Sequence, residues 1–206
     1  MTRTIAARGD QPRMADRIGP GRLVLVVGPS GAGKDTLIDG ARMASKGNAA
    51  LVFPRRVVTR APSEFEDHDT VDPETFDRDC LGGRFALSWN AHGHRYGIPV
   101  SIIKDIRCGQ TVICNVSRTV VDLARDRYAH VVVVLIAAPA HVLEVRLVSR
   151  QRVSDGNLTA RIARSAELDQ SCRPNFVIRN VGRPVIGIRR LLNVIRDPEV
   201  RGGTQT

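Results

Sequence analysis

Short apolar runs rich in β-branched residues recur along the chain, and each is followed by a segment with helical patterning. The runs lie at 23–27, 111–115, 131–137 and 176–178, and the helical segments lie at 35–45, 118–127, 140–150 and 185–196. Pro139 and Pro184 stand where helices of this set would begin, a position that favours proline. Strands that alternate with helices predict a parallel sheet covered on both faces. We therefore expect an α/β fold.

Further segments interrupt this alternation. Residues 55–99 are rich in charge and contain only short apolar pieces, so we expect a small lobe inserted after the first strand–helix unit. A polar, glycine-containing loop separates arginine-bearing helical segments, which predicts a lid over about 146–164. Ligands of open α/β sheets bind at the carboxyl ends of the strands, so the lobe, the lid and the first loop should face one crevice.

The ends of the chain differ from its middle. Residues 1–20 and 198–206 mix charged residues with Gly and Pro, and we expect them to be flexible, whereas 21–197 have the pattern of one folded domain. The first residues lack the apolar stretch of a secretory leader, and no apolar run is long enough to span a membrane. The cysteines form neither a CxxC pair nor a zinc spacing, which fits a reducing cytoplasm.

The loop between the first strand and the first helix carries the strongest chemical signal. Its residues are Gly28, Pro29, Ser30, Gly31, Ala32, Gly33, Lys34, Asp35 and Thr36. A glycine-rich loop between a strand and a helix is the setting of a phosphate-binding P-loop. Its backbone N–H groups can surround an anion, and Lys34 can reach the outer phosphates. The pattern predicts that a nucleoside triphosphate binds here.

The part of this loop that would serve a metal is altered. A P-loop usually has Ser or Thr after its lysine, to hold Mg²⁺, whereas this chain has Asp35 there. The strand over 111–115 ends at Asn115, where many P-loop enzymes have an acid that organises Mg²⁺. We expect Thr36, in preference to Asp35, to contact Mg²⁺, while the nucleotide phosphates and water supply most of its ligands.

The charge balance is strongly basic and is carried by arginine. The formal net charge is +10, and lysine occurs only at Lys34, Lys46 and Lys104. Such a balance suits anionic partners, which include phosphorylated small molecules and nucleic acid. Aromatic residues are few, and no basic run is interleaved with aromatics that could stack bases. We therefore expect a small phosphorylated substrate and no nucleic-acid partner.

Arginines gather in both segments that interrupt the alternation. Arg146 and Arg150 are four residues apart on one predicted helix and share a face, so they could close over a transferring phosphate. In the inserted lobe, Arg56, Arg60 and Tyr96 are residue types that bind anions well. The alternative for the helical arginines is a solvated charged face. Phosphoryl transfer needs such cations more than it needs a nucleophile.

The lobe also contains a pair of histidines that could suggest acid–base chemistry. His92 and His94 flank Gly93, a pattern more typical of a solvated turn than of a general base. A kinase whose acceptor is already a phosphate needs no base, because the acceptor oxygen is ionised near neutral pH. We therefore assign these histidines no catalytic role.

Several blocks of the chain together resemble a known family. GPSGAGKDT at 28–36, FALSWNAHGHRYGIP at 85–99 and NVSR at 115–118 resemble the guanylate kinase group of nucleoside monophosphate kinases. Within that group they are most similar to the ribose 1,5-bisphosphate phosphokinases of bacterial phosphonate breakdown. The resemblance covers about 22–196. It implies a P-loop fold with a core, an acceptor lobe over 55–99 and an arginine-rich lid.

The resemblance also implies a reaction and a set of site residues. ATP, with Mg²⁺, would phosphorylate the 1-phosphate of ribose 1,5-bisphosphate and yield 5-phospho-α-D-ribose 1-diphosphate (PRPP) and ADP. Lys34, Arg146 and Arg150 would be the catalytic cations, and the loop over 28–36 would hold the nucleotide. The substrate contacts would be Arg56, Arg60, Tyr96, Glu66 and Arg118.

The chain departs from guanylate kinases where those enzymes read guanine. Their lobe carries an aromatic-containing DYHF-like run, whereas this chain has DPETF at 72–76, and Asn115 stands where an Asp is usual. Both departures favour a sugar bisphosphate, which has no base to recognise. A nucleoside monophosphate kinase such as guanylate kinase is the alternative. A catalytically inactive binding module and an RNA-binding protein are further hypotheses, and the intact Gly33 and Lys34 disfavour the first of these.

Overall fold

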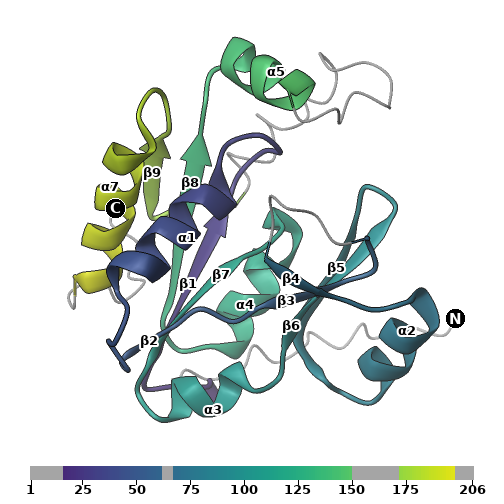
Figure 1. The fold of residues 1–206 in the computed structure, drawn as a ribbon. Helices are drawn as coiled ribbons and strands as arrows, with labels where there is room; N and C mark the ends of the chain where they lie inside the picture. Colours follow the sequence, from purple (N-terminus) through teal and green to yellow (C-terminus); the bar gives the residue numbers. More distant parts are fainter. Residues whose placement is uncertain (1–15, 62–66, 150–171, 198–206) are drawn as a thin grey trace, which may run out of the picture.

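The core of the protein is a five-stranded parallel sheet. Our computed structural model describes residues 16–61, 67–149 and 172–197, and Figure 1 shows their arrangement. In spatial order the strands are β2 (Leu51–Val52), β7 (Thr111–Asn115), β1 (Arg22–Val27), β8 (Val131–Ala137) and β9 (Phe176–Arg179). The predicted α/β class with a central parallel sheet is therefore confirmed. The short edge strand β2 was not predicted, since a run of two residues carries no periodicity.

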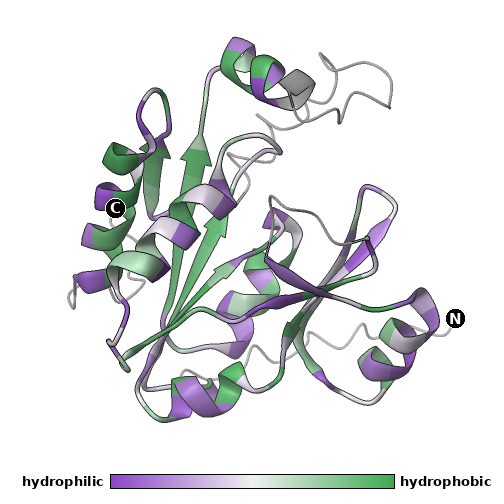
Figure 2. Ribbon diagram, in the orientation of Figure 1, coloured by the Kyte–Doolittle hydropathy of each residue, from purple (hydrophilic) through white to green (hydrophobic). Residues whose placement is uncertain are grey.

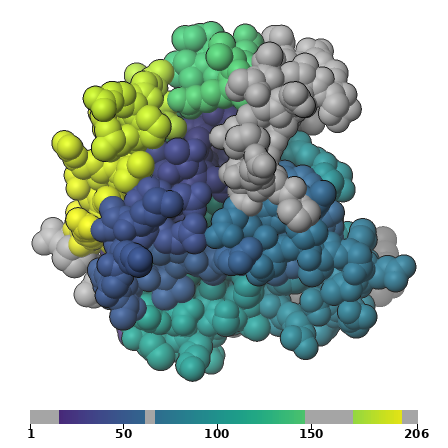
Figure 3. Space-filling view, viewed as in Figure 1, coloured from purple at the N-terminus to yellow at the C-terminus, as the bar shows by residue number. Residues whose placement is uncertain are grey.

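Side chains of the central strand β1 alternate between the faces of the sheet, as a strand period of two requires. Val24 and Val26 point to the face covered by α1 (Lys34–Ala44), α5 (Ala140–Ser149) and α7 (Pro184–Arg196). Leu37 of α1 and Leu191 of α7 are completely buried there. Figure 3 shows α7, in yellow, packed beside α1, in dark blue. Figure 2 shows the matching pattern, with hydrophobic strands inside and polar outer helix surfaces.

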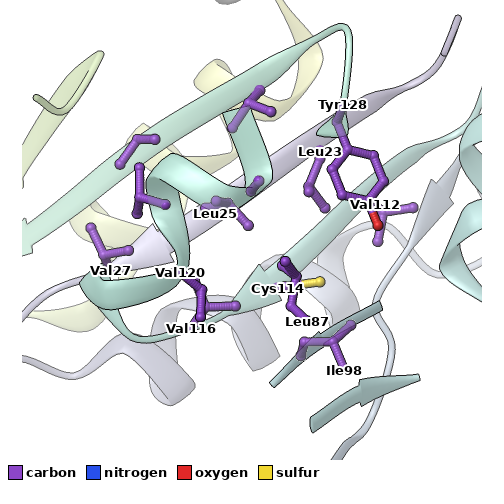
Figure 4. Packing of buried hydrophobic residues seen from close by; sticks show 14 of the residues in the cluster. Leu23, Leu25, Val27, Leu87, Ile98, Val112, Cys114, Val116, Val120 and Tyr128 are labelled. Carbon is purple, nitrogen blue, oxygen red and sulfur yellow. The ribbon is translucent and has the colours of Figure 1, made fainter. Parts of the chain in front are cut away.

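The opposite face of the sheet is covered partly by helices and partly by the lobe. The helices are α3 (Ile102–Arg107) and α4 (Val121–Arg127), and a 3₁₀ turn at Arg118–Val120 precedes α4. Figure 4 shows Leu23, Leu25 and Cys114 of the sheet packed with Leu87 and Ile98 of the lobe. The lobe is therefore continuous with the hydrophobic core, because its apolar pieces complete a face that helices alone were expected to cover.

The lobe is built on a second, four-stranded sheet. Its strands, in spatial order, are β4 (His68–Thr70), β3 (Arg56–Val58), β6 (His94–Pro99) and β5 (Phe85–Ala91), and α2 (Pro73–Leu81) packs on it. Asp72 caps α2 by accepting hydrogen bonds from the Thr75 backbone N–H at 2.8 Å and from the Thr75 hydroxyl. These bonds lower the pKa of Asp72, since they stabilise its carboxylate. Phe76 of α2 stacks on Phe85 with ring centroids 4.6 Å apart.

Residues near the predicted boundaries behave in different ways. Ile18, assigned to a flexible arm, exchanges backbone hydrogen bonds with Arg127 and Ala129, which fixes it beside the end of α4. The predicted lid lies outside the described residues beyond Ser149, as do 198–206. Among the described residues, no helix is both long and apolar enough to cross a membrane.

Candidate active site

A polar pocket lies at the carboxyl ends of β1 and β7, the edge at which open α/β sheets bind their ligands. It joins the glycine-rich loop to the lobe. Its described lining is Gly28, Ser30, Gly31, Gly33, Lys34, Asp35, Thr36, Arg56, Arg60, Trp89, Ala91, His92, Tyr96, Asn115, Val116, Ser117 and Arg118. The loop and the acceptor lobe, which the sequence placed in one crevice, therefore face the same cavity.

The glycine-rich loop has the backbone geometry of an anion cradle. Gly28 has φ 141°, and a Cβ there would lie 2.3 Å from the Ile136 carbonyl oxygen of β8, so a side chain does not fit. Lys34 is the first residue of α1, and its Nζ donates to the Gly28 carbonyl at 2.8 Å and the Pro29 carbonyl at 2.9 Å. The ammonium is thus folded back over the loop, close to where phosphate oxygens would lie.

The outer side of the loop is held by a residue of α5 and by the residue that follows β9. Asn180, directly after β9, is buried, and its Nδ2 donates to the Ala32 carbonyl at 2.7 Å. Arg146 of α5 donates through Nη1 to the Gly31 and Ala32 carbonyls, both at 3.4 Å, and through Nη2 to the Asn180 carbonyl at 3.1 Å. These donors hold the carbonyls of Gly31 and Ala32 and so fix the conformation of the loop.

The lobe side of the pocket combines arginines with an aromatic pair. Arg56 and Arg60 come from β3 and the residues after it. Trp89 of β5 and Tyr96 of β6 are paired across the strands and stack with ring centroids 5.4 Å apart and an interplanar angle of 5°. His92 forms the tip of the β5–β6 hairpin with φ 52°, a left-handed conformation in which His, Asn and Asp are enriched among the residues other than Gly.

Asp35 occupies the centre of a contact between the loop, the core sheet and the lobe. Its Oδ1 accepts a hydrogen bond from Asn115 Nδ2 at 2.7 Å and from Arg56 Nη2 at 3.0 Å. The amide of Asn115 therefore donates to a carboxylate here, at the position where many P-loop enzymes have an acid that organises Mg²⁺. The end of β7 therefore carries an amide in this protein, and the carboxylate near it, Asp35, comes from the loop.

Most of the predicted site residues are brought together. Within the loop, the side chains of Pro29 and Ala32 do not line the pocket, and these residues contribute carbonyls to Lys34 and Asn180 instead. Arg56, Arg60, Tyr96 and Arg118 all line it. Arg146 contacts the loop from behind rather than the pocket lining. Glu66 and Arg150 lie outside the described residues, so their assigned roles stay predictions.

Some residues of the pocket and of the shell around its loop were not found from the sequence. Asn180 could have been found from its position just after the last apolar run, since polar residues at that edge of a parallel sheet face the ligand site. Trp89 could not be distinguished from an ordinary strand residue, because alternation along a strand shows only which residues share a face of the sheet. His92 was assigned to a solvated turn; it does form the turn, which overhangs the pocket.

The cysteine beside the pocket is a core residue. Cys114 precedes Asn115 in β7 and is buried among the residues that join the sheet to the lobe. Burial raises the pKa of its thiol to about 12, so it remains a neutral thiol near pH 7. Burial also raises the pKa of the Tyr128 hydroxyl to about 12. Neither thiol nor phenol is therefore available as an ionised nucleophile near pH 7.

The fold and the pocket together define a guanylate kinase-like P-loop kinase. The crystal structure of guanylate kinase from Anaplasma phagocytophilum superposes with a TM-score of 0.66 and 20% sequence identity, covering 92% of this chain and 89% of that one. At this identity the likeness shows the fold alone. No family model matches the chain.

Curated relatives narrow this class to one family. Ribose 1,5-bisphosphate phosphokinase PhnN of Rhodopseudomonas palustris is 55% identical over 87% of this chain and 90% of its own length. The protein of the same name from Bradyrhizobium diazoefficiens is 51% identical over 91% of this chain and 94% of its own. The protein of the same name from Methylobacterium radiotolerans is 52% identical over 70% of this chain and 82% of its own length. The chain belongs to the ribose 1,5-bisphosphate phosphokinase family.

Proposed function

We propose that this protein transfers the γ-phosphate of ATP to the 1-phosphate of ribose 1,5-bisphosphate and forms PRPP and ADP, a step of phosphonate catabolism. The observation that carries the proposal is identity above 50% over most of the chain to proteins named for this activity. The pocket supports it, since it places a phosphate-binding loop opposite Arg56 and Arg60.

The chemistry asks for positioning and charge neutralisation. An oxygen of the acceptor 1-phosphate attacks the γ-phosphorus. The bond between the γ-phosphorus and the β,γ-bridging oxygen breaks, and ADP leaves with the electron pair of that bond. The attacking oxygen is already ionised near neutral pH, so no side chain has to remove a proton. Lys34 and the loop N–H groups hold the donor phosphates, and Arg56, Arg60 and Arg118 hold the acceptor.

The residues at the loop fit a magnesium ion that enters with ATP. When bound, Mg²⁺ supplies positive charge that neutralises the phosphate oxygens. The Thr36 hydroxyl is exposed in the pocket lining and is the candidate protein ligand. Among the described residues, no group of three or more His, Cys, Asp or Glu could hold a metal ion.

The reaction is tested by identifying the product. Purified protein is incubated with ATP, Mg²⁺ and ribose 1,5-bisphosphate, and ³¹P NMR follows the phosphorus signals. We expect the 1-phosphate singlet to be replaced by the coupled doublets of a diphosphate, in step with ADP formation. ADP formation with an unchanged 1-phosphate signal would show hydrolysis of ATP and contradict the proposal.

All four cysteines are free thiols, which supports our further proposal of a reducing cytoplasmic location.

Asn180→Ala should weaken the binding of ATP and leave the binding of the acceptor unchanged. The substitution removes the buried donor to the Ala32 carbonyl, so the loop loses its outer support. We expect KM for ATP to rise about ten-fold, the scale of one lost hydrogen bond, since the Ala32 carbonyl keeps only the longer contact from Arg146 at 3.4 Å, while KM for the acceptor changes little. Steady-state kinetics with each substrate varied in turn measures both values. Asn193→Ala, at an exposed position of α7, is the control. A rise confined to the acceptor KM would contradict the assignment.

A further inference from the structure

We infer that Asp35 is a positioning residue, whose carboxylate fixes the Arg56 guanidinium at the acceptor side of the pocket. The inference deepens the proposed function and rests on it for the identity of the acceptor. It gives a role to the residue at which this P-loop departs from the usual sequence. It also assigns Asn115 the task of orienting that carboxylate.

The contact joins parts of the fold that must cooperate in phosphoryl transfer. Asp35 lies in the first turn of α1, directly after Lys34, while Arg56 begins the lobe strand β3 and Asn115 ends the core strand β7. The hydrogen bonds from Arg56 and Asn115 end on the same oxygen, Oδ1. The donor-binding loop is therefore tied by one side chain to an arginine of the acceptor lobe.

Burial distinguishes this ion pair from the exposed pairs among the described residues. The Arg56 side chain is 11% exposed and that of Asp35 25%, whereas the pair of Arg55 with Asp69 has 54% on both sides. Solvent screens exposed pairs and long side chains resist ordering, so such pairs contribute little. A pair that is mostly withdrawn from water holds its geometry more firmly.

The pocket is lined mainly by cations, so the presence of the Asp35 carboxylate in it requires an explanation. The described cations that line the pocket are Lys34, Arg56, Arg60 and Arg118, and Asp35 is the described carboxylate among them. A negative charge in a site for anionic phosphates opposes binding. Holding Arg56 offsets this cost, because a guanidinium has five N–H donors and can bind Asp35 and a phosphate together.

Ordering Arg56 before the acceptor arrives should act on acceptor binding. A free arginine loses rotamer entropy when it binds a phosphate, and a guanidinium held in place beforehand loses less. The competing role for Asp35 is that of a metal ligand, in the position of the usual hydroxyl. That role would act on the nucleotide and its Mg²⁺ instead. The two roles therefore predict changes in different kinetic constants.

A double-mutant cycle separates these roles. We expect Asp35→Ala to raise KM for ribose 1,5-bisphosphate about ten-fold, with KM for ATP and the Mg²⁺ requirement unchanged. In the Arg56→Ala background the same substitution should have no further effect on the acceptor KM, since Asp35 acts through Arg56. Equal factors in both backgrounds, or a shifted Mg²⁺ requirement, would overturn the inference. Circular dichroism confirms that each variant is folded.

A matched control and a substrate-free measurement complete the test. Asp79 has a side chain 26% exposed and pairs with Arg84 at 3.5 Å, but it does not line the pocket. Asp79→Ala should leave the acceptor KM unchanged. Without substrate, ¹⁵N NMR of the Arg56 guanidinium should show slow Nη rotation that becomes fast in Asp35→Ala. Fast rotation already in the unmutated protein contradicts the inference even if the acceptor is a different phosphate, so the two proposals fail separately.

Discussion

Lys34→Ala is expected to lower kcat by roughly 10²–10³-fold or more, the scale for removing one charged donor from a transferring phosphate. The Lys34 Nζ donates to the Gly28 and Pro29 carbonyls. From there a change of side-chain rotamer carries it to the outer phosphates of ATP. Alanine keeps the helix start, since it has the best helix propensity, so the fold should remain intact.

The measurement for Lys34→Ala is single-turnover phosphoryl transfer, because it reports chemistry without product release. Thermal unfolding of the variant should match that of the unmutated protein. Lys46→Ala is the control, since Lys46 is also a lysine but is exposed just beyond α1. Transfer within a few-fold of the unmutated rate would remove the P-loop lysine from the mechanism.

Gly33→Ala is expected to abolish ATP binding and to lower the free energy of unfolding by about 2–4 kcal/mol, from backbone strain and overpacking together. Gly33 has φ 88°, which L side chains rarely adopt, and a Cβ there would lie 2.5 Å from Asn180 Nδ2. The clash displaces the donor that holds the Ala32 carbonyl. The loop therefore loses both its conformation and its outer support.

Gly47 provides a matched control for this substitution. It also has φ 88°, but a Cβ at Gly47 has no atom within 4 Å, so Gly47→Ala adds strain without a clash. We expect it to cost about 1 kcal/mol of unfolding free energy and to leave ATP binding intact. Equal losses of stability in both variants would show that the contact with Asn180 contributes nothing. Calorimetric titration with a non-hydrolysable ATP analogue measures the binding.

The core sheet could be predicted because its strands are buried on both faces. A continuous apolar run such as 131–137, rich in valine, is typical of a strand inside a covered parallel sheet, and the helix after each run follows from the alternation. The lobe was harder to predict, since β3 and β4 have three residues each and one face of the lobe packs on the core. Residues such as Leu87 and Ile98 read as isolated apolar pieces in sequence, and only the fold shows that they complete a face of the sheet.

The site was predictable where backbone geometry dictates the residue type. A loop that wraps phosphate needs glycine at positions such as Gly33, so its pattern is visible in the sequence. Contacts between distant side chains leave no such pattern. The meeting of Asp35 with Arg56 and Asn115 depends on how β3 and β7 are placed beside α1. The sequence therefore showed that Asp35 was unusual without showing what it binds.

The acceptor preference tests the central claim most directly. The specificity constant kcat/KM is measured for ribose 1,5-bisphosphate and for GMP at the same ATP and Mg²⁺ concentrations. We predict a ratio above about 10³ in favour of the sugar bisphosphate, since the chain has DPETF at 72–76 in place of the aromatic-containing run with which guanylate kinases read guanine. A ratio in favour of GMP would contradict the account and make the protein a nucleoside monophosphate kinase.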